Sequence, residues 1–161
     1  MLNKLFIIIN ILSLFLTINT FAQNQDDKLA IIKNKDYIEW LTSKDFEIWY
    51  PNSSELVQIE EILLQAIRDD KFNFLKTKRI VELKKKYYRQ YLCYTNESGE
   101  KIVYINSMCE LFTDYDKDNK PIKFDWKTKM VDVSDGGECY WNIKINLTNK
   151  TYFDLIINGY G

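Results

Sequence analysis

The sequence predicts an α+β fold in which one main helix packs on a four- to five-stranded antiparallel sheet. Two observations predict it. One segment repeats apolar residues at helical spacing, and most of the chain after residue 71 alternates apolar and polar residues as strands do. A helix and a sheet that each have one apolar face bury these faces against each other, which gives a layered α+β structure. In outline this arrangement is cystatin-like.

The main helix is predicted for residues 53–70. Its apolar residues recur at helical spacing, and Asn52 with Glu55 three positions later has the spacing of a capping box. Pro51 ends a short extended piece just before it, and a shorter helix is expected over residues 36–42.

The strands are predicted from alternating apolar and polar residues and from the turn residues between them. The first hairpin has a four-residue turn, and a polar loop follows it. We expect strands over residues 84–94, 101–112, 126–133, 139–147 and 152–157, with the first turn at Asn96–Gly99, a polar loop at 114–121 and a further turn or bulge at 135–137.

Residues 1–22 have the features of a secretory signal peptide. Residues 5–15 are almost all apolar, and Thr20 and Ala22 satisfy the small-residue rule at the cleavage site. The apolar run is short for a membrane span, so no membrane span is expected after the leader is removed. Residues 23–161 are then expected to be a single exported α+β domain, either periplasmic or secreted.

The composition excludes several kinds of function. The chain has 161 residues, a net charge of −1 and no His. The absence of His excludes Cys–His and Ser–His catalysis and zinc sites that contain His. The near-zero net charge provides no overall basic field for nucleic acid. No catalytic residue and no cofactor are predicted.

An acidic segment, Asp114–Asn119, begins like a calcium-binding loop because carboxylates at alternate positions can converge on one cation. It departs from that pattern because Asn119 occupies the position that needs Gly and Asp125 the position that needs Glu. We therefore interpret it as a solvated loop and predict no metal site.

A run of basic residues interleaved with Tyr precedes and enters the first predicted strand. Such a run can bind anionic ligands, but a charged edge strand that resists sheet-to-sheet pairing is the simpler interpretation. Export does not favour nucleic acid as a partner. The basic residues are Lys76, Lys78, Arg79, Lys84, Lys85, Lys86 and Arg89.

The three cysteines suggest one disulfide. Cys109 and Cys139 each fall on the apolar side of a predicted strand, so both are expected to point toward the core. A four-residue turn pairs Thr95 with Glu100 and places Cys93 on the opposite face. We predict a Cys109–Cys139 disulfide with Cys93 free, and three separate thiols remain the alternative.

The same register predicts a binding surface on the first hairpin. It places Tyr91 opposite Tyr104 and Arg89 opposite Asn106, with Tyr87 two residues along on the same face. Tyr rings with an Arg fork suit a glycan, a peptide or a partner protein. Two alternatives stay open: these pairs simply stabilise the hairpin, or the segment of residues 28–50 buries them.

Three stretches of the chain resemble a family of small exported bacterial proteins that is still uncharacterised. They are Trp49–Pro51 leading into the helix with Glu60, YRQYLCY at 88–94 followed by IVYIN at 102–106, and DGGECY at 135–140 with the ending NGYG at 158–161. The resemblance implies an exported, single-domain α+β protein and no particular activity.

We therefore expect an exported binding or interaction module of unknown ligand rather than an enzyme, with a protein, peptide or glycan as its partner. Two alternatives remain. One is an envelope-associated structural protein, and the other is a hydrolase-type enzyme that works without His. An interaction module should show an exposed aromatic patch or an open strand edge.

Overall fold

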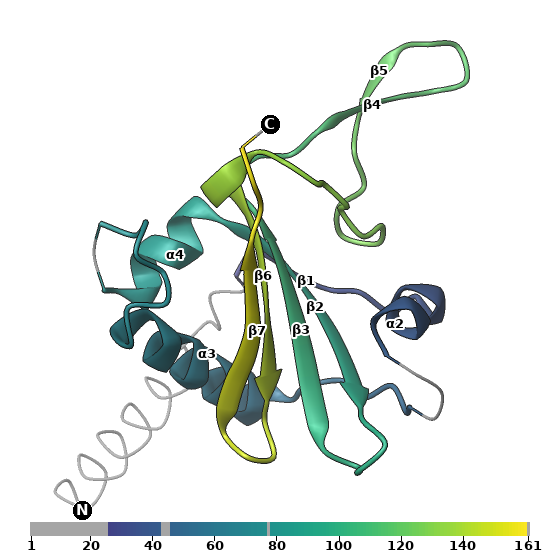
Figure 1. Ribbon diagram of the computed structural model, residues 1–161. Coiled ribbons are helices and arrows are strands. Elements are labelled where there is room, and N and C mark those ends of the chain that lie inside the picture. The colour runs from purple at the N-terminus through teal and green to yellow at the C-terminus, as the bar shows by residue number, and fades with distance from the viewer. Residues whose placement is uncertain (1–25, 43–45, 77, 161) are drawn as a thin grey trace, which may run out of the picture.

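A computed structural model describes residues 26–42, 46–76 and 78–160, so the predicted leader at 1–22 lies outside the described residues. The described residues form the predicted α+β fold, in which helices pack on a five-stranded sheet (Figure 1). The strand order is β1-β2-β3-β6-β7, with β1 parallel to β2 and the other neighbours antiparallel. The elements are β1 (Leu29–Ile31), α2 (Lys35–Leu41), α3 (Ser53–Arg68), α4 (Ile80–Lys86), β2 (Tyr88–Thr95), β3 (Lys101–Met108), β4 (Thr113–Tyr115), β5 (Pro121–Lys123), β6 (Tyr140–Asn146) and β7 (Thr151–Ile157).

Helix α3 begins with the predicted capping box. The Asn52 side chain accepts hydrogen bonds from the N–H groups of Ser54 and Glu55, and Glu55 Oε2 accepts one from the N–H of Asn52 at 2.9 Å. These bonds satisfy backbone donors that the first turn of a helix leaves without partners. The main helix is therefore confirmed, and it ends at Arg68.

Helices α3 and α4 cover one face of the sheet, which we call the front face, and α2 lies on the opposite side, the back face (Figure 1). Trp141 of β6 is buried in the centre of the front core. The rings of Phe72 and Tyr87 meet it edge-on, with centroids 4.9 and 5.5 Å away. Such edge-to-face contacts add to the stabilisation from burial.

The predicted strand over residues 126–133 is wrong, because this segment forms a turn followed by irregular backbone on the back face. The backbone N–H and carbonyl groups of this segment form hydrogen bonds with one side chain instead of with a neighbouring strand. Gln90 Nε2 donates to the carbonyls of Trp126 and Lys129 at 2.6 and 2.7 Å, and Gln90 Oε1 accepts from the N–H of Val131 at 2.9 Å.

Four further features differ from the sequence prediction. Residues 80–86 form helix α4, although the first strand was predicted to begin at residue 84, and Leu29–Ile31 forms edge strand β1. The predicted polar loop at 114–121 is the end of the β4–β5 hairpin, which projects from the sheet (Figure 1). The β3 strand stops at Met108, short of the predicted end at 112.

Strand β7 contains a bulge that changes its predicted alternation. Asp154 has φ +50°, and the pairing with β6 shifts between Asn142 and Lys144. An extra residue therefore sits opposite Ile143. As a result Tyr152 and Leu155 both pack against the front core. A regular alternation would instead place Leu155 on the same face as Phe153.

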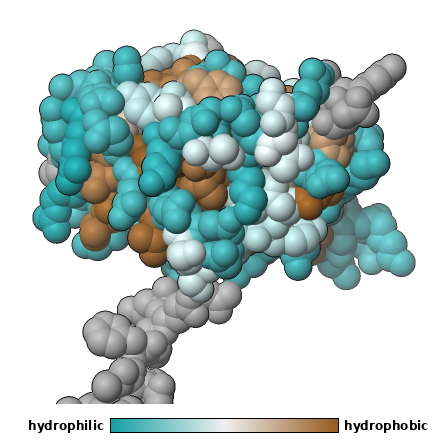
Figure 2. Space-filling view, turned by 90° about the horizontal axis from the view of Figure 1, so that it is seen from below, coloured by the Kyte–Doolittle hydropathy of each residue, from teal (hydrophilic) through white to brown (hydrophobic). Residues whose placement is uncertain are grey.

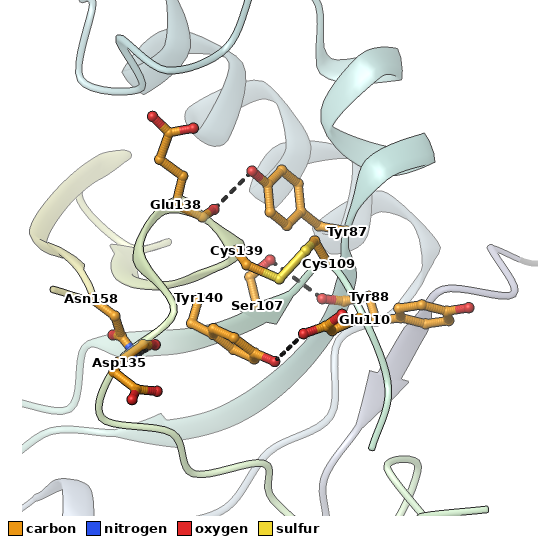
Figure 3. Close-up of a disulfide and its surroundings, with 10 residues drawn as sticks. All are labelled: Tyr87, Tyr88, Ser107, Cys109, Glu110, Asp135, Glu138, Cys139, Tyr140 and Asn158. Carbon is orange, nitrogen blue, oxygen red and sulfur yellow. Dashed lines mark hydrogen bonds between the residues drawn. A yellow bond between two sulfur atoms is a disulfide. The ribbon is translucent and has the colours of Figure 1, made fainter. Parts of the chain in front are cut away.

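The Cys109–Cys139 disulfide is confirmed, with Cα atoms 4.9 Å apart, and Cys93 is free and buried (Figure 3). Two tyrosines flank it. The Tyr87 hydroxyl donates to the carbonyl of Glu138 at 2.9 Å, and the Tyr140 hydroxyl donates to Glu110 Oε1 at 3.3 Å. The disulfide fixes the ends of a segment that contains the β4–β5 hairpin.

Candidate functional site

The predicted register of the first hairpin is wrong by one residue. Thr95 pairs with Lys101 rather than Glu100, because the loop has five residues instead of four. Asn96 stabilises the longer loop: its Oδ1 accepts hydrogen bonds from the N–H groups of Ser98 and Glu100 at 3.1 and 2.9 Å. A shift of one residue moves every side chain of one strand to the other face relative to its partner.

The predicted binding surface is therefore not formed. Tyr87, Arg89 and Tyr91 lie in the front core, whereas Tyr104 is buried on the back face and Asn106 is half-buried there. Tyr91 pairs with Ile105 and Arg89 with Ser107. Residues of α3 and α4 pack in the same core cluster as Tyr87 and Tyr91, and Leu29 and Trp49 also pack against it. The prediction of one exposed face is wrong because it depended on the register.

Arg89 forms an ion pair inside the protein and does not face a ligand site. Its Nη2 lies 2.5 Å from Asp26 Oδ2, and Lys84 Nζ lies 3.4 Å from the same carboxylate and 2.5 Å from Glu60 Oε1. Arg89 is only 1% exposed. This network joins the segment before β1 to α3, α4 and β2. Lys84 and Arg89 of the basic run therefore bind carboxylates of the protein itself, as does Lys78, whose Nζ lies 2.6 Å from Asp70.

A hollow in the back face offers a different candidate site. Its inner part has a volume of about 80 Å³ and its outer part about 220 Å³, and Trp40, Met130 and Asp132 line both. We call the two parts together the back-face pocket. The side chains of interest are Tyr37, Trp40, Tyr104, Met130, Asp132 and Asn142.

The inner part of the back-face pocket brings together polar groups with no protein partner. Tyr104, Asn142 and Asp132 line it, and none makes a side-chain hydrogen bond with any described residue. Burial, with a smaller effect of Asp132, raises the pKa of Tyr104 to about 12. The Tyr104 hydroxyl therefore stays protonated near neutral pH and can donate a hydrogen bond.

The outer part is aromatic and apolar with one charge. Trp40 of α2 is 68% exposed, which is unusual for so large an apolar side chain. Tyr37 lies one helical turn before it, so both residues are on one face of α2. Met130 and Asp132 complete the lining from the segment opposite.

Three amide side chains hold the wall of the pocket in place. Gln90 binds the N–H of Val131, Asn106 Nδ2 donates to the Val131 carbonyl at 2.6 Å, and Asn158 Nδ2 donates to the Val133 carbonyl at 2.5 Å. These bonds fix backbone on both sides of Asp132. Gln90 and Asn106 are the polar residues among the apolar and aromatic residues at alternate positions of β2 and β3, and this signal for the clamp was missed in the sequence analysis.

The acidic segment uses its carboxylates locally. Asp116 Oδ1 accepts hydrogen bonds from the N–H groups of Asp118 and Lys120, both at 2.9 Å, at the hairpin tip. Among residues 26–42, 46–76 and 78–160, no group of three or more Asp, Glu or Cys side chains is placed to hold a metal ion. Across these same ranges no helix has the length and apolar character needed to cross a bilayer.

Exposed apolar side chains also occur on β7, at the edge of the sheet. Phe153 and Ile156 are 39% and 56% exposed, but the bulge at Asp154 interrupts the edge and hinders addition of another strand. The end of the molecule that carries the hairpin turns shows separate hydrophobic patches between hydrophilic residues (Figure 2). The back-face pocket is therefore the better candidate.

No protein-family model matches this chain, and no curated protein or solved structure matches it either. The function is therefore argued from the geometry of the back-face pocket.

Proposed function

We propose that this protein is an exported module that binds a small ligand, or one group of a larger partner, in the back-face pocket. One observation carries the proposal: Tyr104, Asn142 and Asp132 line a hollow beside the exposed ring of Trp40 without partners in the described protein. Ligand sites combine an apolar wall with a few polar groups that converge.

Export is supported by the disulfide. The Cys109–Cys139 bond is typical of proteins in oxidising compartments. The signal-peptide features of residues 1–22 and the resemblance to small exported proteins agree with it. The periplasm or the cell exterior is therefore the proposed location.

The hydrogen bonds that hold the pocket wall support a site that is preformed before the ligand binds. Gln90 is fully buried, and the segment that it clamps carries Met130 and Asp132. When the pocket wall is already ordered, ligand binding costs less conformational entropy. The proposed ligand therefore enters with little rearrangement of the protein.

An NMR titration of the isotope-labelled protein tests this function. The ligands are neutral saccharides, organic carboxylates, organic ammonium compounds and short peptides, and the readout is the indole N–H resonance of Trp40. We expect at least one class to shift this resonance in a saturable way. Trp40→Ala should weaken the binding, followed in this variant through the backbone amide resonances of Met130 and Asp132, whereas Tyr115→Ala, which removes another exposed aromatic ring, should not.

The proposed function is overturned if no class of ligand shifts the Trp40 resonance. It is also overturned if Trp40→Ala and Tyr115→Ala leave the affinity equally unchanged, because the ligand then binds elsewhere.

A further inference from the structure

We infer that the outer part of the back-face pocket binds a methylated ammonium group, such as the trimethylammonium group of a small soluble compound. This inference rests on the proposed function, because it names the ligand chemistry of the same site. It is argued from the rings of Tyr37 and Trp40 and from the carboxylate of Asp132.

The two aromatic rings provide the first component of such a site. The face of an aromatic ring is electron-rich and attracts a cation, and Trp attracts it most strongly. Tyr37 and Trp40 come from one face of α2 and line the same hollow. Met130 adds a polarisable thioether opposite them, which suits contact with methyl groups.

The charge of Asp132 provides the second component. Its carboxylate forms no ion pair with any described Lys or Arg. Basic residues near the pocket have other partners: Lys129 lies 4.0 Å from Asp114, and Lys144 lies 3.1 Å from Asp154. An unneutralised carboxylate favours a cationic ligand and disfavours an anionic one.

The hydrogen-bonding capacity of the lining favours a methylated cation over a primary ammonium group. A primary ammonium has three N–H donors that each need an acceptor. The lining of the outer hollow offers one carboxylate, two aromatic rings and a thioether. A trimethylammonium group has no N–H donor, so aromatic and thioether contacts satisfy it fully.

The size of the hollow favours a small compound. A volume of about 220 Å³ accommodates a trimethylammonium head group with a short tail. The adjoining inner hollow, with Tyr104 and Asn142, then offers hydrogen-bond partners to a hydroxyl group on that tail.

Titration with choline and with its uncharged isostere, in which a tert-butyl group replaces trimethylammonium, tests the inference. The two compounds have the same shape and differ in charge. Choline should shift the Trp40 indole resonance and bind clearly more tightly than the isostere. Trp40→Ala should weaken choline binding by about twofold or more.

The charge is tested with Asp132→Asn against Asp118→Asn as the matched control. Asp118 is an exposed carboxylate at the tip of the β4–β5 hairpin. Asp132→Asn should weaken choline binding by about two- to fivefold, as expected for an ion pair with an exposed carboxylate, and should leave binding of the isostere unchanged. Asp118→Asn should change neither.

The inference is overturned by equal affinities for choline and its isostere, or by an Asp132→Asn variant that binds choline like the wild type. Binding of a trimethyllysine peptide or of phosphatidylcholine vesicles without binding of choline also overturns it. A saccharide or carboxylate that shifts the Trp40 resonance while choline does not would overturn this inference and leave the proposed function standing.

Discussion

The side chain of Gln90 accepts a hydrogen bond from the backbone N–H of Val131 at 2.9 Å, in the buried interior of the back face. The same amide donates to the carbonyls of Trp126 and Lys129. One glutamine thus replaces the strand neighbour that these backbone groups lack. The position of Asp132 in the back-face pocket depends on this contact.

Gln90→Leu should therefore destabilise the protein and loosen the pocket wall. It leaves the buried N–H of Val131 without its partner, which costs about 1–3 kcal/mol in the free energy of unfolding. Denaturant unfolding measures this loss, and hydrogen exchange should show faster exchange of the Val131 amide. The exposed Gln65→Leu should change stability by less than about 0.5 kcal/mol. Equal stability of both variants would contradict the clamp.

Loss of the disulfide should lower stability. Replacing Cys109 and Cys139 by Ser should reduce the free energy of unfolding by about 2–4 kcal/mol, because the cross-link constrains the unfolded chain. Thiol titration of the unfolded wild type should find one free thiol, that of Cys93. Three thiols in protein purified without a reductant would contradict the disulfide.

Glu55 should make stability depend on pH. Its hydrogen bond from Lys101, followed by that from the Asn52 N–H, lowers the pKa of Glu55 in the folded state. A lowered folded pKa gives stability that is present above the unfolded pKa and is lost as the pH falls through the folded pKa. Glu55→Gln should thus flatten the acid limb of the stability–pH curve, whereas the exposed Glu61→Gln should not. Parallel acid limbs for wild type and Glu55→Gln would contradict this linkage.

Gly137 and Gly159 should respond differently to replacement by Ala. Gly137 has φ +54°, and an added Cβ would lie 2.2 Å from the Tyr160 ring, whereas one at Gly159 meets nothing within 4 Å. Gly137→Ala should therefore lower the melting temperature, at a cost of about 1 kcal/mol, and Gly159→Ala should be nearly neutral. A Gly159→Ala variant that is the less stable of the two would refute this explanation.

Local signals in the sequence were sufficient to predict part of the fold. The Asn52 capping box and the apolar spacing after it define α3. The alternation around Trp141 defines the inner strand β6. The predicted disulfide is correct, but the face predicted for Cys93 is wrong, because Cys93 lies in the front core with Val103.

The remaining features depend on single contacts that have no periodic signature. One extra residue in the loop held by Asn96 moves Tyr91 to the front face, while Tyr104 stays on the back face, so the predicted binding surface does not form. Helix α4 is short, has no side-chain N-cap hydrogen bond and buries only Leu83, so its pattern is weak. The back-face pocket forms because Gln90 binds a segment 41 residues away in sequence.

Nuclear Overhauser effects between the methyl protons of bound choline and the protein test the central claim most directly, because they locate the ligand. The account predicts contacts from these methyl protons to the Trp40 ring and the Met130 methyl group, which line the outer hollow. Contacts confined to another surface, such as Phe153 and Ile156 on β7, would contradict it.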